Sequence, residues 1–206
     1  MTDAKKELLN ILLTKSIKTG HFILASGKES DLYCDCRITA LDARGANLIG
    51  QVGWELVQEE IMPKFPNVKA IGGMTMGADP ISLAIGMYSV EGEEPLKVFT
   101  VRKEAKDHGE GGTFVGYVPQ AGEEIVIIED VITAGTAIRE SMEILSHLEG
   151  TKVIATFIMV DRKEKGQTEK GAMQEIEEQF GFPVYSIVDV YDIIEYLEED
   201  EANREH

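Results

Sequence analysis

One stretch of sequence decides the fold: Ile125-Val126-Ile127-Ile128-Glu129-Asp130-Val131-Ile132-Thr133-Ala134-Gly135-Thr136-Ala137. Its first four residues are all apolar, which indicates a strand buried on both faces, as in a parallel sheet. Two acids follow, then a turn of small and hydroxylated residues, and then a helical pattern over 137–148. Ligands of open α/β sheets bind at the carboxyl ends of the strands, so the same stretch predicts a binding site.

The rest of the chain alternates in the same way. Short apolar runs bounded by Gly, Pro or charge predict further strands over 68–71, 96–101, 153–160 and 184–188. Helical spacing predicts helices over 8–13, 43–60, 80–87 and 170–180, and over the front half of 191–206. Strands interleaved with helices predict an α/β fold with a central parallel sheet and right-handed crossovers. No repeat or linker divides the chain, so we expect a single domain, 1–206.

Composition excludes several classes of protein. The chain has 206 residues, with 20 Lys and Arg against 37 Asp and Glu, and its formal net charge is −17. Such an acidic chain lacks the basic face of a sequence-independent nucleic-acid binder. The longest apolar stretch, 153–160, is far too short to span a bilayer, and no secretory signal is visible. Cys34 and Cys36 cannot build a disulfide framework or a four-thiolate zinc site, and we expect buried thiols that alternate along a strand. These features predict a cytoplasmic protein with neither nucleic-acid nor membrane partners.

The turn after the acids has the chemistry of a phosphate site. Residues 133–137 can aim several backbone N–H groups and the hydroxyls of Thr133 and Thr136 at one anion, with a helix N-terminus behind them. Glu129 and Asp130 would repel phosphate, whereas carboxylates suit the vicinal hydroxyls of a ribose. The stretch therefore predicts a sugar-phosphate site. The alternative is a turn that only caps a helix beside solvated acids, and two adjacent acids at the end of an apolar strand weigh against it.

A basic segment follows the predicted strand 96–101. Arg102, Lys103, Lys106 and His108 put four cationic groups within seven residues of an otherwise acidic chain, and glycines at 109, 111 and 112 favour mobility. Cations on a flexible loop suit an anionic substrate that must be covered and later released. The alternative is a solvated surface loop in which neighbouring acids compensate the charge.

Several motifs resemble those of known proteins. The run E-D-V-I-T-A-G-T-A (129–137) resembles the phosphoribosyl pyrophosphate (PRPP) motif of type I phosphoribosyltransferases. The loop R-K-E-A-K-D-H-G-E-G-G (102–112) resembles the catalytic loop of the orotate phosphoribosyltransferase family. Three more segments resemble parts of that family: 22–33 its orotate-pocket segment, 73–81 its pyrophosphate-side loop, and Asp161-Arg162 its orotate-binding pair. The resemblance covers about residues 22–196.

The resemblance implies a fold and a reaction. The fold would be the type I phosphoribosyltransferase fold, with about residues 1–40 forming a small hood over the base pocket. The reaction would transfer the 5-phosphoribosyl group from PRPP to orotate, giving orotidine 5′-monophosphate and pyrophosphate. Mg²⁺ would be carried on the oxygens of PRPP, without a metal site of the protein. The protein would be a homodimer in which each catalytic loop reaches into the partner's active site.

The resemblance also implies roles for single residues. Those on PRPP would be Arg102, Lys103, Lys106, His108, Glu129, Asp130, Val131, Ile132, Thr133, Ala134, Gly135, Thr136 and Ala137. Those on orotate would be Thr133, Arg162 and Tyr33. The catalytic residues would be Lys106, His108 and Arg102; loss of Lys106 would slow the chemistry most, and His108 would donate either a proton or only a hydrogen bond. Ala25 and the 73–81 loop lack lysines that some members carry, so pyrophosphate would meet fewer cations, unless Lys28 substitutes.

Two other functions remain open on the sequence. One is a phosphoribosyltransferase for a different base, against which the loop 102–112 and Arg162 both argue. The other is a non-catalytic PRPP-sensing regulator, which would need a nucleic-acid-binding segment. Neither the 21 residues before Phe22 nor the acidic tail suits that role.

Overall fold

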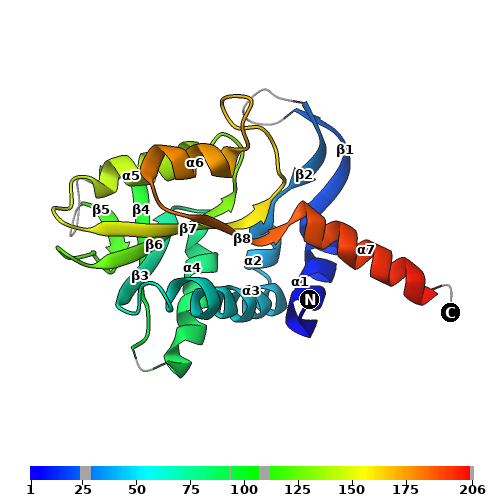
Figure 1. Cartoon of the computed structure of the whole chain (residues 1–206), viewed down its shortest axis with the longest axis horizontal. Helices are drawn as coiled ribbons and strands as arrows, with labels where there is room; N and C mark the ends of the chain where they lie inside the picture. Colours follow the sequence, from blue (N-terminus) through cyan, green and yellow to red (C-terminus); the bar gives the residue numbers. More distant parts are fainter. Residues whose placement is uncertain (24–28, 93, 107–111, 205–206) are drawn as a thin grey trace.

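A six-stranded sheet runs through the centre of the protein (Figure 1). The computed structural model describes residues 1–23, 29–92, 94–106 and 112–204. In the sheet order β5-β4-β3-β6-β7-β8, all neighbours pair in parallel except β5, which pairs antiparallel with β4. The strands are β3 (Val68–Met74), β4 (Lys97–Lys106), β5 (Gly112–Gly116), β6 (Glu124–Val131), β7 (Lys152–Asp161) and β8 (Val184–Asp189). The predicted α/β fold with a central parallel sheet is confirmed.

Helices cover both faces of this sheet. Helices α3 (Ala43–Leu56) and α4 (Ala78–Tyr88) pack on one face, and α5 (Thr136–Leu145) and α6 (Ala172–Phe180) on the other (Figure 1). Side chains of β6 alternate between them: residues 126 and 128 join the core under α3 and α4, and residues 125 and 127 join the core under α5. The unbroken apolar run of β6 follows from this double coverage.

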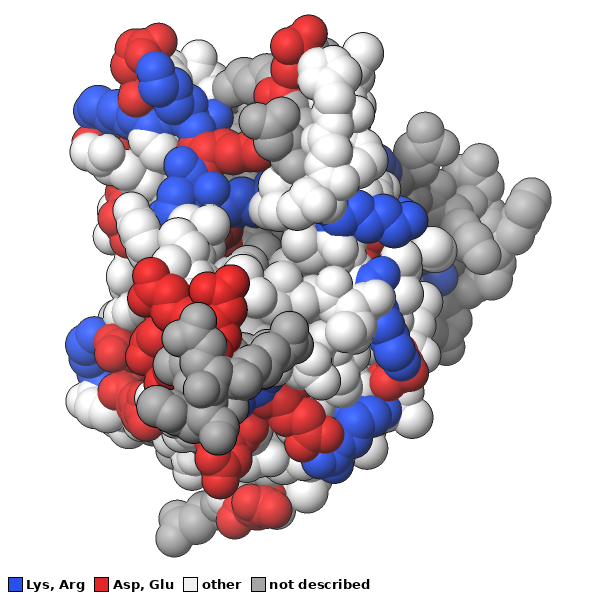
Figure 2. All heavy atoms as spheres, turned by 90° about the vertical axis from the view of Figure 1, so that its right-hand side faces the viewer, with Lys and Arg blue, Asp and Glu red and all other residues white. Residues whose placement is uncertain are grey.

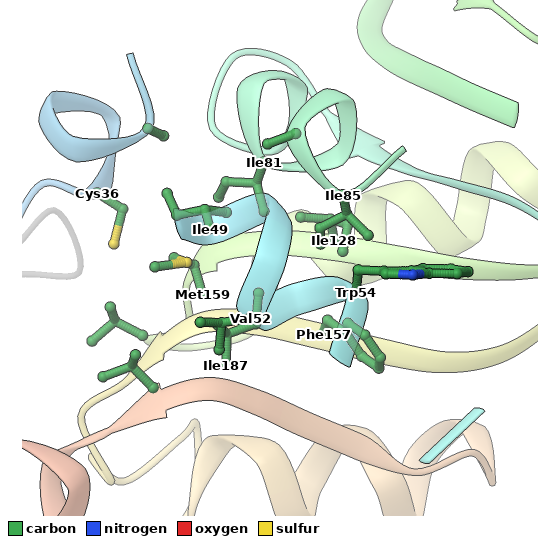
Figure 3. Packing of buried hydrophobic residues seen from close by; sticks show 14 of the residues in the cluster. Cys36, Ile49, Val52, Trp54, Ile81, Ile85, Ile128, Phe157, Met159 and Ile187 are labelled. Carbon is green, nitrogen blue, oxygen red and sulfur yellow. The ribbon is translucent and has the colours of Figure 1, made fainter. Parts of the chain in front are cut away.

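The larger core lies between the sheet and the helices α3 and α4. Figure 3 shows Ile49 of α3 near Ile81 of α4, and Ile85 of α4 near Ile128 of β6. Val52 of α3 lies next to Ile187 of β8 in the same view. The two helices approach closely because α3 carries glycine at the crossing. A Cβ atom on Gly50 would lie 2.6 Å from the carbonyl oxygen of Ala84, which is far inside van der Waals contact.

The N-terminal region adds a separate two-stranded sheet. Helix α1 (Asp3–Ile11) and the π-helical turn η1 (Leu12–Ser16) lead into β1 (Ile17–Ile23), which pairs antiparallel with β2 (Glu29–Cys34). The short helix α2 (Cys36–Ala40) then connects to α3. Leu8, Leu9 and Leu12 are fully buried in the same core as α3 and α4. Beside α1 lies the C-terminal helix α7 (Val190–Arg204), tied to it by ion pairs of 2.9 Å (Lys5–Asp192) and 2.6 Å (Lys6–Glu199).

Several elements differ from the expectation. The strand predicted over 96–101 continues to Lys106, because β5 pairs with it as a hairpin that the sequence analysis did not include. Cys36 was expected on a strand and begins α2 instead, because the Asp35 side chain accepts a hydrogen bond of 3.1 Å from the N–H of Arg37 and caps the helix. The predicted helix 43–60 is α3 followed by the π-helical turn η2 (Val57–Ile61), and a short 3₁₀ turn η3 (Ser89–Glu91) follows α4.

Charge is unevenly distributed on the surface. Figure 2 shows acidic side chains gathered in the lower part of one face, and Lys and Arg side chains on both sides of an uncharged central area above them. The acids Glu195, Glu198, Glu199 and Glu201 of α7 contribute to the negative charge. Among the helices in the described ranges, none has both the length and the apolar character that crossing a membrane would require.

The helix crossing gives a prediction for Gly50. Gly50→Ala should lower the free energy of unfolding by about 1–3 kcal/mol, because the added methyl group overpacks the contact between α3 and α4. This loss should occur although alanine favours helix by about 1 kcal/mol over glycine. Chemical denaturation followed by circular dichroism measures the change. Asn47→Ala, at an exposed position of the same helix, is the matched control. A Gly50→Ala protein as stable as this control would contradict the close packing.

Candidate active site

The predicted phosphate loop, residues 133–137, leads from β6 into α5. Gly135 has φ 68°, the left-handed conformation that favours glycine, and forms the N-cap of α5. A Cβ atom there would also lie 2.8 Å from Cδ1 of Ile176 on α6. Thr136 at the start of the helix is exposed, and Thr133 is half-buried. The loop therefore places backbone N–H groups and hydroxyls at a helix N-terminus, a geometry that can hold a phosphate.

The two acids lie where β6 ends. The carboxyl group of Asp130 sits against Gly77 in the predicted pyrophosphate-side loop, and a Cβ atom on Gly77 would lie 2.7 Å from Cγ of Asp130. This contact brings two segments of the sequence together, 129–137 and 73–81. Burial, with Asp130 and Glu140 adding negative charge nearby, raises the pKa of Glu129 well above its ordinary value.

The pyrophosphate-side loop is held by its own hydrogen bonds. The hydroxyl of Thr75 donates to the Asp79 carboxylate at 2.7 Å, and the N–H of Thr75 donates to the carbonyl oxygen of Val101 at 2.9 Å. The Thr75–Met76 peptide bond is cis. The loop therefore connects the end of β3 to β4 and to the first turn of α4. It contains no lysine, as the sequence showed.

The predicted cationic residues are distributed along the end of β4. Arg102 is half-buried, and Lys103 is exposed with its Nζ 3.0 Å from a carboxylate oxygen of Glu140 on α5. Lys106 is the last residue of β4 and pairs through its backbone with Gly112. Its side chain and the whole of His108 lie outside the described residues, as do Ala25 and Lys28.

Arg162 follows β7 directly and is buried, with a side chain that is 4% exposed. Its Nη1 donates to the carbonyl oxygen of Leu32 at 3.0 Å, and its Nη2 lies 3.0 Å from the Glu164 carboxylate. Its Nε is buried and has no hydrogen-bond partner in the part of the chain that the structure describes. A buried guanidinium with an unpaired donor suits an anionic ligand.

The contact between Arg162 and Leu32 joins the predicted orotate-pocket segment to the end of β7. Tyr33, the next residue of β2, lies against Phe22 of β1 with ring centroids 5.4 Å apart. A surface hollow of about 650 Å³ opens beside these elements and is lined by Glu29 and residues 164–169. The residues predicted on orotate therefore share one end of the sheet with the phosphate loop, since β6 and β7 are parallel neighbours.

Arg139 also contacts the phosphate loop, although no motif in the sequence predicted it as a site residue. This residue lies in the first turn of α5, and its Nη1 donates to the carbonyl oxygen of Ala134 in the phosphate loop. A signal was present, because the helix dipole disfavours a cation near a helix N-terminus. An arginine at that position therefore requires a specific partner.

A protein-held metal ion would need a cluster of ligands. Within the described ranges, no group of three or more His, Cys, Asp and Glu side chains is arranged to hold one. Glu129 and Asp130 supply hard oxygen donors beside the phosphate loop. Mg²⁺ commonly uses one or two carboxylates together with substrate phosphates and water, so this pair fits a Mg²⁺ ion that arrives on a phosphorylated substrate.

Known proteins resemble the chain in sequence and in structure. No family model matches it. Orotate phosphoribosyltransferase of Pseudomonas fluorescens is 35% identical over 190 residues, which cover 92% of this chain and 86% of that protein. The orotate phosphoribosyltransferase of Mycobacterium tuberculosis has a TM-score of 0.72 at 29% identity, covering 92% of this chain and 98% of that one. The same enzyme in complex with PRPP has a TM-score of 0.69 at 26% identity, with the same coverage. The chain therefore belongs to the orotate phosphoribosyltransferase family.

Proposed function

We propose that the carboxyl edge of the six-stranded sheet is the active site of this family member. The protein transfers the 5-phosphoribosyl group from PRPP to orotate, giving orotidine 5′-monophosphate and pyrophosphate, in pyrimidine biosynthesis. The phosphate loop, residues 133–137, binds the 5′-phosphate of PRPP. Glu129 and Asp130 accept hydrogen bonds from the ribose hydroxyls. Arg162, with Tyr33 and Thr133, binds orotate.

One observation carries the assignment of the orotate site. Arg162 is buried, yet its Nε has no hydrogen-bond partner among the described residues. Leaving a buried donor unpaired costs about 1–3 kcal/mol, and more when the group is charged. The carboxylate of orotate would satisfy that donor with a charge-assisted hydrogen bond. Glu164 balances the charge of Arg162 through Nη2, which leaves Nε for the ligand.

The cations of 102–108 act on the leaving group. As pyrophosphate departs, negative charge grows on its oxygens, and orotate N1 attacks C1′ from the opposite face. This chemistry needs no nucleophile of the protein; it needs both reactants in position and the growing charge neutralised. Arg102, Lys103, Lys106 and His108 supply that positive charge. Lys103 would exchange its partner Glu140 for a phosphate oxygen.

The proposal also includes Mg²⁺ carried on PRPP, a hood formed by the N-terminal region and a cytoplasmic location. Glu129 and Asp130 would supply oxygen donors to a Mg²⁺ ion carried on PRPP, and the ion would offset part of the negative charge of the substrate. Residues 1–40 form the hood over the base as part of a single domain, supported by the contact from Arg162 to Leu32 and by the shared core of α1 and α3. The two cysteines are free thiols, which suits a cytoplasmic protein.

We also propose a homodimer whose 102–112 loop acts in the partner's site. Apolar side chains on α4 support a contact with a second copy: Leu83 and Met87, one turn apart, are 55% and 64% exposed. Met76, in the loop just before α4, is also exposed. A partner docked along this face would therefore lie close to the pyrophosphate side of the site.

The reaction is tested by the fall in ultraviolet absorbance of orotate with PRPP and Mg²⁺, with adenine, hypoxanthine and uracil as parallel acceptors. We expect conversion of orotate alone. Arg162→Met should raise KM for orotate at least tenfold, since it removes a charged hydrogen-bond donor from a carboxylate. Lys165→Met, an exposed cation paired with Glu169 in the same loop, is the control. Turnover of another base would overturn the assignment of orotate, and retained PRPP binding without any turnover would favour a sensor.

Glu129→Gln should change stability and PRPP affinity in opposite directions at pH 8, raising the first and lowering the second. Burial raises the folded-state pKa of Glu129 above its ordinary 4.5, so its ionisation opposes folding at neutral pH. The variant should therefore unfold at a higher denaturant concentration than the wild type at pH 8, and this advantage should disappear as the pH falls below 4.5. PRPP should bind the variant more weakly, because an amide replaces the carboxyl group proposed to accept hydrogen bonds from the ribose hydroxyls. Glu124→Gln, at the other end of β6, should show neither effect; a pH-independent difference for Glu129→Gln would contradict the buried charge.

Subunit mixing tests the loop in trans. Lys106→Ala and Asp130→Asn should each be nearly inactive as homodimers. If the loop crosses the interface, a mixed dimer carries both lesions in one site and none in the other. Random reassortment of equal amounts should then restore about a quarter of wild-type activity, because half of the dimers are mixed and each has one intact site of two. Mixing Glu129→Gln with Asp130→Asn, two lesions on the same strand, should restore nothing. No recovery in the first mixture would show that the loop acts in its own subunit.

A further inference from the structure

Arg139 lies against the phosphate loop, in contact with Ala134 and close to Gly135. Its Nη1 donates to the carbonyl oxygen of Ala134, so a charged group holds one peptide of the loop. The guanidinium also fills the space beside Gly135, where a Cβ atom would lie 3.0 Å from Nη1. Its side chain is 22% exposed, which limits the directions that it can take.

The bond to Ala134 fixes the direction of an N–H group. In a planar trans peptide, the carbonyl oxygen and the amide hydrogen point in opposite directions. Arg139 holds the Ala134 oxygen, so the N–H of Gly135 points away from the guanidinium, and we infer that the phosphate binds on that side. Without this bond the Ala134–Gly135 peptide is free to rotate, since Gly135 adopts either sign of φ readily.

Helix α6 holds the guanidinium in place. The Nε of Arg139 donates to the side-chain oxygen of Gln179 at 2.7 Å, and its Nη2 lies 3.7 Å from a carboxylate oxygen of Glu175. Glu175 is buried, whereas its neighbour on the next turn, Glu178, is exposed and pairs with Lys170. Arg139 is therefore fixed on three sides: by the loop, by Gln179 and by Glu175.

Glu175 also anchors the segment 162–171, the Arg162 loop. Its carboxylate accepts hydrogen bonds from the N–H of Gln167 at 2.9 Å and from both the N–H and the hydroxyl of Thr168 at 2.6 Å. A Cβ atom on Gly166 would lie 2.3 Å from Oε2 of Glu175, so the loop backbone runs directly over the carboxylate. The hydrogen bonds from Thr168 and Gln167 lower the pKa of Glu175 to about 2, and the carboxylate stays charged throughout the neutral range.

We propose that Arg139 is a positioning residue that aims the phosphate loop at PRPP and, through Glu175, couples this loop to the Arg162 loop. The inference rests on the proposed function, because it takes residues 133–137 as the phosphate site and Arg162 as the orotate site. It adds a physical link between the two halves of the site. The phosphate loop contacts Arg139, the Arg162 loop contacts Glu175, and Arg139 and Glu175 form an ion pair. A shift of one loop therefore changes the contacts of the other loop.

Arg139→Met tests the positioning role. The phosphate bound by this loop does not react, so its contacts are equal in the ground state and the transition state and should appear in KM rather than in kcat. We expect KM for PRPP and the calorimetric Kd of Mg²⁺–PRPP to rise at least tenfold, while kcat changes less than threefold. Gln179→Ala should give a smaller rise of about threefold, because the bond to Ala134 remains. Glu178→Gln, at an exposed position of α6, should leave both values unchanged.

The coupling is tested by a double-mutant cycle. Glu175→Gln should raise KM for both PRPP and orotate, and Arg139→Met combined with Glu175→Gln should raise KM for PRPP by less than the product of the single effects. If the double variant raises KM for PRPP by the product of the two single effects, Arg139 and Glu175 act independently and the proposed coupling is wrong. An Arg139→Met enzyme with wild-type affinity for PRPP, or one whose loss lies entirely in kcat, would overturn the positioning role.

The proposed reaction and the positioning role of Arg139 can be disproved independently of each other. If the wild-type protein binds Mg²⁺–PRPP but does not convert orotate, the proposed function fails, and calorimetry of the Arg139 variants still decides the positioning role. If the wild type converts orotate and the Arg139→Met protein binds PRPP as tightly, the positioning inference alone fails. Thermal unfolding of each variant shows whether a general loss of stability accounts for weaker binding.

Discussion

The structure depends on the burial of β6 between two layers of helices. A strand covered on both faces has no position where a charged side chain meets water, so Ile125 to Ile128 are apolar without interruption and fully buried. Polar residues enter only where the helices no longer cover the strand. Glu129 and Asp130 lie at that boundary, and the loop that turns into α5 follows them at once. The same burial that holds the sheet together therefore places the chemistry at its edge.

Cationic side chains gather at the carboxyl edge of the sheet, although the chain as a whole is strongly acidic. The chain carries a formal net charge of −17, yet the substrates are anions. Screening over about 8–10 Å at physiological salt leaves nearby cations in control of an anionic ligand. Arg162, Arg139 and Lys103 each have a carboxylate partner: Glu164, Glu175 and Glu140 respectively. These acids balance the charge of the cations and hold them in place. Under the proposed function Lys103 would exchange Glu140 for an oxygen of the substrate, whereas Arg162 and Arg139 would keep Glu164 and Glu175.

The parts of the fold that could be predicted are those with a strong repeat in the sequence. The strands β3, β6, β7 and β8 and the helices α3 to α6 follow from apolar runs and helical spacing. The strand β5 has no such pattern and exists because β4 offers it an edge. Cys36 alternates with Cys34 like a strand residue, but the cap from Asp35 decides for a helix. In the site, motif residues could be named in advance. Arg139 gave only an indirect signal, a cation near a helix N-terminus, because its role arises from contacts with Ala134 and with α6.

Gly73 and Gly77, in the pyrophosphate-side loop, differ in what an added side chain would contact. A methyl group on Gly73 would meet the backbone oxygen of Ile128 at 2.1 Å, which can be relieved only by moving a strand. A methyl group on Gly77 would meet only the carboxyl group of Asp130, which can swing away. Among variants screened for folding alone, alanine should thus be rejected at 73 and accepted at 77. Among variants screened for growth that depends on the enzyme, both should be lost. Gly73 therefore leaves room for the backbone of β6, whereas Gly77 leaves room for the carboxyl group of Asp130.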